Sequence, residues 1–255
     1  MSESVRAVER ALAVLACFNN QTPELTLTQI SERIGINKST VHRLLATLER
    51  NHFLERDSQT GIYRPGIRLL QLAHLALENN DLRRIADPFL RQLCDLHREN
   101  VNLSFLDGTD VVYLDVIESP QRVKLAAVTG QRLPAFSTAS GKAILAFLPE
   151  EIVQQLLARG IPQYTLRTLT SPSDLLEDFV RARERGFAIS EQEFEDGINA
   201  IAAPIFNAGH QPIASVSVAG PAYRLSKERM VEISPSVMET ANKIAQEVRL
   251  AMRLD

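Results

Sequence analysis

Two stretches in the N-terminal quarter of the chain repeat their apolar residues at helical spacing, and a short alternating stretch follows them. The first stretch, residues 26–34, opens on Thr26 and has Gln29 three positions later, which is the spacing of a capping box at a helix start. Its apolar stripe consists of Leu27, Ile30 and Ile34. The pattern predicts a short, N-capped amphipathic helix.

Gly35 comes directly after this stretch, where a helix can end in a left-handed conformation that glycine adopts without steric cost. The second stretch, residues 36–50, again has apolar residues at helical spacing, with polar residues on its other faces. Its apolar residues are Val41, Leu44, Leu45 and Leu48. We therefore expect a second helix, with a polar face that could enter a DNA major groove.

Residues 53–56 and 62–64 alternate like short strands around an Asp-Ser-Gln-Thr-Gly loop, which predicts a β-hairpin. Two helices joined by a tight turn and followed by a hairpin form the layout of a winged helix-turn-helix, so DNA binding is the leading interpretation. Short hydroxyl residues and long cations suit phosphates and base edges. The predicted DNA-contacting residues are Thr28, Lys38, Ser39, Thr40, His42, Arg43, Arg56 and Arg64.

Charge distinguishes this prediction from a simpler one in which the two helices are only core, as in many proteins that never bind nucleic acid. Residues 33–68 contain seven lysines or arginines and three acidic residues, whereas the whole chain has a net charge of −3. A basic segment that coincides with a helix-turn-helix is the electrostatic pattern of a DNA-binding protein. Double-stranded operator DNA is the expected partner.

Further helices are predicted on both sides of this motif. Residues 5–18 place apolar residues at helical spacing, so this helix could close the small core or pair with a copy of itself in a dimer that reads two half-sites. Residues 67–100 predict a helical linker with a break at 79–81 and with Pro88 at the start of its second half.

From Val101 onward the pattern changes to mixed strands and helices. Asp107 and Gly108 separate two apolar runs and predict a hairpin. Further strands are expected at 123–128, 187–190, 198–206 and 213–219, and helices at 141–147, 150–158, 173–185 and 226–253. This order predicts an α+β domain with helices on one side of an antiparallel sheet and a one-sided core.

Composition is that of an ordinary globular protein of 255 residues, with 45% hydrophobic and 23% charged residues. No stretch approaches the roughly 20 apolar residues that a membrane-spanning helix needs. Glu3 and Glu9 lie in the first residues and no small-residue cleavage pattern follows, so we expect no signal peptide and a cytoplasmic location. Cys17 and Cys94 lie on apolar helical faces and are expected to pack as reduced side chains.

A serine-rich run at residues 137–142 raises the question of catalysis. A Walker phosphate loop would need glycine where Phe136 stands and a hydroxyl residue in place of Ala143, and a Ser-x-x-Lys pair would need serine in place of Ala139. The histidines without clustered polar partners are His74, His97 and His210. We therefore expect no enzyme activity, no metal site and no cofactor.

Longer motifs give a more specific indication. The segments RAVERALAVLACF, LTLTQISERIGINKSTVHRLLATLERNHFLERD, PAFSTASGKAILAFL, RGFAISEQEFEDGINAIAAPIF and VAGPAYRL together resemble the IclR family of bacterial transcriptional regulators. The resemblance implies an N-terminal mostly-α winged helix-turn-helix in residues 1–66, a helical linker in 67–100 and a C-terminal α+β, GAF-like effector-binding domain in 101–255. It also implies dimers or dimers of dimers. Asn37 departs from the proline that many members have there, so a side-chain cap is expected.

The serine-rich run can also present backbone N–H groups at the start of the helix near Gly141, which would suit a carboxylate or another anion. The resemblance implies an effector cavity formed by this loop and by positions on the strands. The assigned residues are Leu125, Leu133, Ser137, Thr138, Ala139, Ser140, Gly141, Ser190, Ile198, Ala200, Ser215, Ser217 and Ala219. A simpler interpretation of Ser215 and Ser217 is that they alternate along a half-buried strand, and both can hold.

Family members that sense small oxo-acids tend to carry polar or charged side chains where this chain has Ser190, Ala200 and Ala219. A larger or less polar organic acid is therefore the predicted effector. The sequence thus predicts a cytoplasmic, sequence-specific transcriptional regulator that senses a small organic acid. The alternative from a different class is a ligand-binding protein or an enzyme with a vestigial helix-turn-helix.

Overall fold

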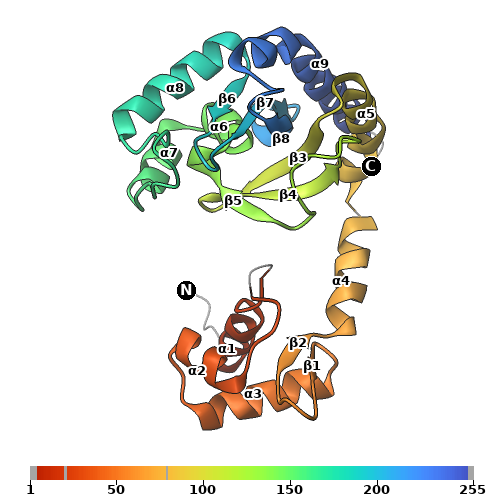
Figure 1. Ribbon diagram of the computed structural model, residues 1–255, viewed down its shortest axis with the longest axis vertical. Helices are drawn as coiled ribbons and strands as arrows, with labels where there is room; N and C mark the ends of the chain where they lie inside the picture. Colours follow the sequence, from red (N-terminus) through yellow and green to blue (C-terminus); the bar gives the residue numbers. More distant parts are fainter. Residues whose placement is uncertain (1–4, 20–21, 79, 252–255) are drawn as a thin grey trace. The chain divides into compact units, whose positions relative to one another are not determined.

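The computed structural model describes residues 5–19, 22–78 and 80–251, and the chain divides between Asn79 and Asn80 into two compact units. Each unit is coloured by sequence in Figure 1. The elements of the first unit are α1 (Arg6–Leu15), α2 (Leu27–Ile34), α3 (Lys38–Arg50), β1 (Leu54–Arg56), β2 (Tyr63–Pro65) and α4 (Ile67–Glu78). Strands β1 and β2 pair antiparallel, so the predicted winged helix-turn-helix is confirmed.

Local capping interactions set the ends of the two central helices. Thr26 accepts a hydrogen bond from the Gln29 backbone N–H, and the Gln29 side chain accepts one from the Thr26 backbone N–H at 2.8 Å. Gly35 ends α2 with φ of 65°. Asn37 caps α3 by accepting from the Thr40 backbone N–H at 3.0 Å. The capping box, the glycine turn and the side-chain cap predicted from the sequence are all present.

The core of the first unit lies between the helices and the wing. Its buried residues are Val14, Leu25, Ile30, Val41, Leu45, Leu48, Leu54 and Tyr63. Helix α1 contributes only Val14 to this buried set, while Val8 and Leu12 are 55% and 59% exposed. The expectation that the apolar stripe of α1 closes the core is therefore wrong for most of the stripe, because only one face of α1 meets α2 and α3.

The second unit is built on a six-stranded antiparallel sheet in the order β5-β4-β3-β8-β7-β6. Its strands are β3 (Asn100–Asp107), β4 (Asp110–Ile117), β5 (Arg132–Pro134), β6 (Ala188–Glu191), β7 (Ile198–Phe206) and β8 (Pro212–Pro221). Its helices are α5 (Asp81–His97), α6 (Ala139–Leu145), α7 (Glu150–Leu157), α8 (Pro172–Arg185) and α9 (Lys227–Ala251), with a 3₁₀ turn η1 (Ala135–Ser137) before α6. The predicted α+β class is confirmed.

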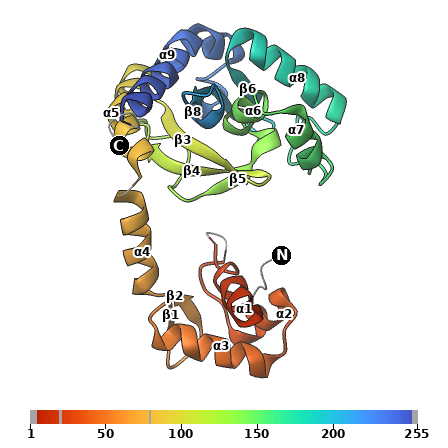
Figure 2. The ribbon, with the colours of Figure 1, turned by 180° about the vertical axis from the view of Figure 1, so that it is seen from behind.

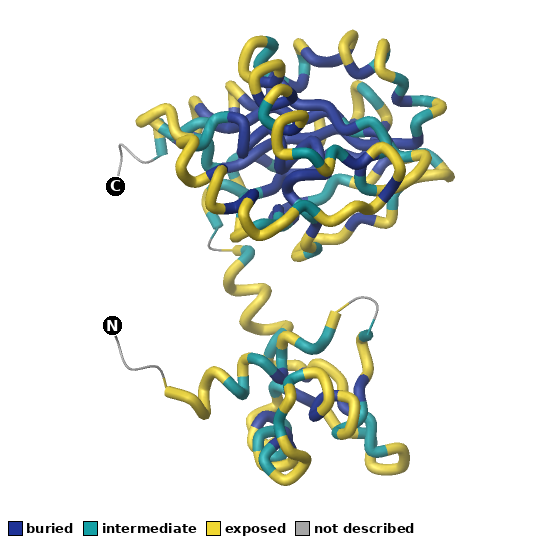
Figure 3. Tube along the Cα trace, turned by 90° about the vertical axis from the view of Figure 1, so that its left-hand side faces the viewer, coloured by how far each residue is buried: buried dark blue, intermediate teal, exposed yellow. Residues whose placement is uncertain are grey.

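Helices cover both faces of this sheet. On one face, Ala202 of β7 packs in a buried cluster with residues of α6, α7 and α8. Side chains alternate along a strand, so its neighbours Ile201 and Ala203 point to the other face, over which α9 packs beside α5 (Figure 1 and Figure 2). The strands are therefore largely buried, as the dark blue trace in Figure 3 shows. The one-sided core predicted from the sequence is wrong.

Two further predictions need correction. Residues 123–128 form no strand, because their backbone binds side chains instead: Leu125 O accepts from Asn100 Nδ2 at 3.3 Å and Val123 O accepts from Arg224 Nη2 at 2.8 Å. Pro88 does not open a helix but lies inside α5. The predicted break at 79–81 is present at its described positions, since Asn80 caps α5 by accepting from the Arg83 backbone N–H.

The last predicted helix extends through α9, and its expected end at 252–253 lies outside the described residues. None of the helices in the described ranges combines the length and the apolar character needed to cross a membrane.

Candidate functional site

Helix α3 presents a polar and positively charged face to solvent. Lys38, Ser39, His42 and Arg43 are exposed, and Thr40 is half-buried. Within the described residues, the side chains of Lys38, His42 and Arg43 have no hydrogen-bond or ion-pair partner. Together with the positive end of the helix dipole, these free groups suit phosphates and the base edges of a major groove.

The wing arginines differ from Arg43, since both already have a partner. Arg64 Nε lies 2.8 Å from Glu24 Oε1, and both side chains are about half exposed. The Arg56 guanidinium lies 5.7 Å from the centre of the Tyr63 ring, in a cation–π arrangement. Glu24 offsets the charge of Arg64, whereas Arg56 has no acidic partner among the described residues, like Lys38 and Arg43 of α3. Thr28, the remaining residue predicted to contact DNA, is exposed in α2.

The second unit contains a cavity of about 370 Å³ between the sheet and the start of α6. This volume lies within the range of small-molecule sites. Most of the residues predicted to bind an effector line it, namely Leu125, Leu133, Ser137, Thr138, Ala139, Ser140, Ser190, Ile198, Ala200, Ser217 and Ala219. The chain thus brings together the irregular segment with Leu125, strand β5, the loop before α6 and the strands β6, β7 and β8.

Gly141 and Ser215, also predicted, do not line the cavity. The Gly141 backbone N–H donates to Thr138 Oγ1, and a Cβ at this position would lie 2.1 Å from the Ala135 carbonyl oxygen. Glycine is needed there for the close approach of α6 to η1. Ser215 Oγ donates to the Ser140 carbonyl at 3.1 Å, which holds α6 against β8. Both residues therefore have structural contacts in place of the predicted ones.

The polar end of the cavity is the loop before α6. Ser137 is almost fully buried, and its Oγ has no hydrogen-bond partner among the described residues. Its carbonyl accepts from Ser190 Oγ at 3.0 Å, which fixes the loop against β6. On β8, Ser217 Oγ accepts from Asn102 Nδ2 at 3.3 Å and keeps its own proton available. This end offers hydroxyl donors in a water-poor setting.

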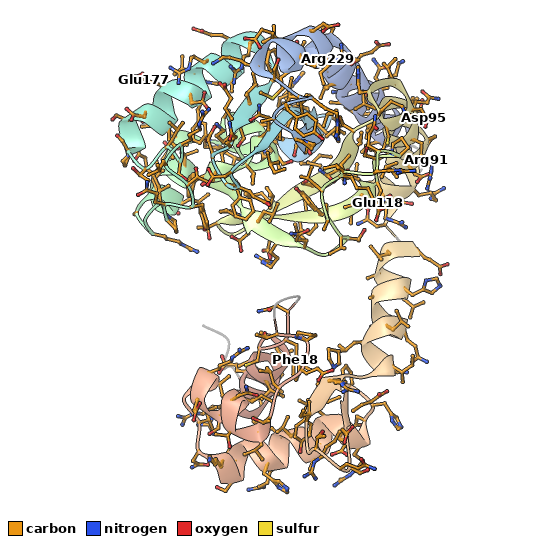
Figure 4. The ribbon with its side chains drawn as sticks, viewed as in Figure 1. Phe18, Arg91, Asp95, Glu118, Glu177 and Arg229 are labelled. Carbon is orange, nitrogen blue, oxygen red and sulfur yellow. The ribbon has the colours of Figure 1, made fainter. Side chains whose placement is uncertain are left out.

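Several lining residues were not anticipated from the sequence: Tyr113, Lys124, Ala126, Ala127, Gln131, Phe194 and Glu195. Most lie in irregular segments, which carry no periodic signal. Lys124 Nζ is bound to Glu118, a carboxylate just past the end of β4 that Figure 4 labels. Glu195 is exposed at the cavity. An anion in the cavity would therefore meet hydroxyls and amides before any unpaired cation.

Tyr113 could have been found from the sequence. It lies on β4 two residues after Val111, so strand alternation places both side chains on the same face. Both belong to the buried cluster that packs against α6. Burial raises the pKa of the Tyr113 phenol far above its ordinary value, so the hydroxyl stays neutral.

Lys142, next to the serine-rich run, lies in a buried ion-pair network behind the cavity. Its side chain is 1% exposed, and Nζ lies 2.7 Å from Asp178 Oδ2 and 2.6 Å from Glu193 Oε1. Burial raises the pKa of Glu193, and the Lys142 charge opposes that shift. Both carboxylates hold the ammonium in place, so Lys142 is not positioned as a nucleophile or base. The network connects α6 with α8 and with the loop that carries Phe194.

The histidines also remain separate. His97 Nε2 lies 2.7 Å from Ser236 Oγ between α5 and α9, and burial lowers the pKa of His97. His74 pairs with Glu78 on the exposed surface of α4. In the described part of the chain, no group of three histidine, cysteine or acidic side chains could hold a metal ion.

Comparison with known proteins gives a consistent result. Residues 7–58 match the family model described as the IclR helix-turn-helix domain, and residues 74–246 match the one described as the bacterial transcriptional regulator IclR C-terminal domain. The transcriptional repressor IclR of Escherichia coli K12 is 32% identical over 94% of this chain and 89% of its own length.

Solved structures agree over nearly the whole chain. An IclR-type transcriptional regulator from Alicyclobacillus acidocaldarius is 30% identical and covers 96% of this chain and 99% of its own, with a TM-score of 0.87. An IclR homologue from Microbacterium hydrocarbonoxydans, crystallised in complex with 4-hydroxybenzoate, is 26% identical and covers 96% and 99%, with a TM-score of 0.81.

Proposed function

The chain belongs to the IclR family of bacterial transcriptional regulators, and we propose that it is an effector-responsive member that reads a pseudo-palindromic operator and senses a small organic acid. The observation that carries this proposal is the combination of a free cationic face on α3 with a ligand-sized cavity in the second unit of the same chain. Such a regulator acts in the cytoplasm, where the DNA is.

Operator reading is assigned to α3. Its N-terminal half carries Lys38, Ser39 and His42 on the exposed face with Arg43, and hydroxyls and long cations there can contact both phosphates and bases. Arg56 and Arg64 of the wing would contact the adjacent backbone, with Arg64 exchanging Glu24 for a phosphate. The linker is assigned to residues 67–100, which span α4 and α5.

Arg43→Ala should weaken specific operator binding by about 1–3 kcal/mol, or roughly 5- to 150-fold, because a bidentate guanidinium contact to a base is worth that much. Folding should not change, since the side chain is exposed and has no partner among the described residues. Fluorescence anisotropy on operator and scrambled DNA at one salt concentration measures both affinities.

Arg167→Ala is the matched control, because it removes the same charge from an exposed loop of the second unit. It should leave operator affinity within about twofold of the parent, in keeping with the small effect of a solvent-screened surface charge outside the DNA-binding unit. Parent-like operator affinity in Arg43→Ala would remove Arg43 from the DNA interface.

The effector is assigned to the cavity of the second unit. Hydroxyl groups of Ser137 and Ser217 and the Ala139 and Ser140 amides at the start of α6 suit a carboxylate. Leu133, Ile198 and Ala200 make the other walls apolar. A cavity of about 370 Å³ fits an acid larger than a two- or three-carbon one. The 4-hydroxybenzoate complex of the Microbacterium relative supports this class of ligand.

A homodimer, and from it a dimer of dimers, is the proposed assembly. Two apolar surfaces of the first unit support it. Val8 and Leu12 of α1 are exposed, and α4 has no buried residue among its described positions although it includes Ile67 and Leu70. An isolated helix of this length is marginal in water, so packing against a second copy would stabilise it. Two copies would also match two operator half-sites.

Leu12→Glu should raise the dimer dissociation constant at least about tenfold, because a buried, unpaired carboxylate at an apolar interface costs more than 1.4 kcal/mol. Analytical ultracentrifugation across nanomolar to micromolar concentrations measures the constant. Leu166→Glu is the control, since Leu166 is 97% exposed in the second unit and lies on no proposed interface. A parent protein that stays monomeric at micromolar concentration would contradict the assignment.

An enzyme or a storage-type ligand-binding protein with a vestigial helix-turn-helix is the competing function. The relatives with assigned roles are transcriptional regulators. Lys142, which follows the loop that lines the cavity, is held by two carboxylates. A mobility shift on the DNA upstream of its own gene distinguishes the two functions, because only the regulator should bind it specifically.

A further inference from the structure

Tyr113 adds a hydroxyl group to the cavity besides the serine hydroxyls that are assigned to the carboxylate. The residue is 7% exposed, and it lines the cavity from β4, on the side of the sheet away from α5 and α9. Among the described residues its hydroxyl has no hydrogen-bond partner. The hydroxyl oxygen is not fully occluded from solvent, so water or a ligand can reach it through the cavity.

The position of Tyr113 is set by its backbone. Its N–H donates to the Gln131 carbonyl at 3.0 Å, and its carbonyl accepts from the Gly130 N–H at 2.7 Å. These bonds hold β4 against the segment before β5, so the backbone that carries the Tyr113 ring is fixed. The raised pKa keeps the phenol protonated, and it can therefore both donate and accept a hydrogen bond.

Tyr113 and the Ser137 loop mark two separate positions in the cavity. Asp110 of β4 pairs with Pro134, just before η1, and Tyr113 lies three residues further along the strand. At the rise of an extended strand, the Tyr113 backbone lies about 10 Å along β4 from the level of Pro134. Tyr113 and Ser137 therefore line the same cavity from different elements, β4 and the loop before α6.

We propose that the Tyr113 hydroxyl is a specificity-determining group that binds a second polar substituent of the effector, at the end of the ligand opposite its carboxylate. The effector would then be a hydroxy acid, or an acid with a comparable hydrogen-bonding group, on a ring or a chain of similar length. This inference rests on the proposed effector site. Its physical basis is that a buried hydroxyl without a partner favours a ligand that supplies one.

Isothermal titration calorimetry with two matched pairs of acids tests the inference. The pairs are benzoate with 4-hydroxybenzoate, and hexanoate with 6-hydroxyhexanoate, and each pair differs in one hydroxyl. The parent should bind the hydroxylated member of at least one pair more tightly by about fivefold or more. Tyr113→Phe should bring that ratio close to one and leave the affinity for the other member within about twofold.

Tyr223→Phe is the matched control, because it removes the same atom from an exposed tyrosine outside the cavity. It should keep the parent ratio. Thermal unfolding without ligand adds a second readout: Tyr113→Phe should be at least as stable as the parent, since no hydrogen bond is lost. A lower melting temperature would mean that the hydroxyl has a structural partner, and it would overturn the inference.

The calorimetry separates this inference from the proposed function. Suppose that the acids bind the parent, but Tyr113→Phe keeps the parent's affinity ratio within each pair or loses the same affinity for both members. The role given to Tyr113 is then wrong, and the effector site stands. If none of the four acids binds the parent, the proposed effector class fails and the inference fails with it.

Discussion

Lys142→Met should lower the free energy of unfolding by about 3–5 kcal/mol, the effect of removing one partner from a buried ion pair. Lys142 Nζ lies within 2.7 Å of carboxylates on both Asp178 and Glu193. Without Lys142, Asp178 would still have Arg181 at 3.5 Å and Arg185 at 3.9 Å. Glu193 would lose its cation. Methionine preserves the volume, so the loss reports the charge. Urea denaturation at pH 7 measures it.

The pH dependence of this loss has a defined sign. A carboxyl group whose pKa is raised by folding opposes folding when it is ionised, and the penalty disappears as the pH falls through the raised pKa. Burial already raises the pKa of Glu193, and removing Lys142 removes the main opposing charge. The deficit of Lys142→Met should therefore shrink between pH 7 and pH 5.

Lys243→Met is the control for this experiment, because Lys243 forms an exposed ion pair with Glu239 one helical turn away. Its loss should cost under about 0.5 kcal/mol. If Lys142→Met were as stable as the parent at pH 7, the buried network would contribute nothing, and the description of α6 as anchored to the Glu193 loop would be wrong.

Ala200→Asp should weaken binding of an organic acid at least about 100-fold, because two carboxylates in a water-poor cavity repel each other or force one to take up a proton. Ala200 lies on β7, lines the cavity and pairs in register with Ala219 of β8, another lining residue. Calorimetry with the acid that binds the parent most tightly measures the loss.

Ala200→Asn is the matched control, since it has nearly the same shape as aspartate without the charge. It should bind the acid more tightly than Ala200→Asp, and the gap between the two variants isolates the electrostatic term. Equal affinities in the parent and in Ala200→Asp would place the anion elsewhere in the unit.

The elements that the sequence predicted best are those whose determinants are local. Thr26 with Gln29, Gly35 and Asn37 fix helix ends through neighbours four or fewer residues away, and all of these features are present. The strand expected at 198–206 has those bounds, because a continuous apolar run needs no distant partner to be recognised.

The errors arise where distant partners decide the structure. Residues 123–128 have the composition of a strand, but Asn100 and Arg224 bind their carbonyls. The stripe of α1 has the period of a core helix, yet Val14 alone is buried, and periodicity cannot show whether a stripe meets its own chain or another one. The two-sided cover of the sheet depends on the placement of α9 over β7, a long-range contact.

The sequence predicts most of the cavity lining, because the family resemblance supplies its strand positions. It does not identify the residues whose role depends on spatial neighbours. Tyr113 lies on a predicted strand, but nothing local shows that its hydroxyl lacks a partner. The local pattern predicts Gly141 as an amide donor, whereas the close approach of the Ala135 carbonyl explains the glycine. In both cases the neighbours in the folded chain decide the role of the residue, and the local sequence pattern does not show them.

The central claim is that one chain couples operator binding to occupancy of the cavity, and a fluorescence anisotropy titration of operator DNA with and without the bound acid tests it most directly. At fixed salt, the parent should bind operator over competitor DNA, and saturating acid should change that affinity roughly 5- to 150-fold, as a coupling of 1–3 kcal/mol requires. Ala200→Asp should bind the operator like the parent and not respond to the acid. An operator affinity that stays the same while calorimetry shows the acid bound would contradict the account, as would the absence of specific DNA binding.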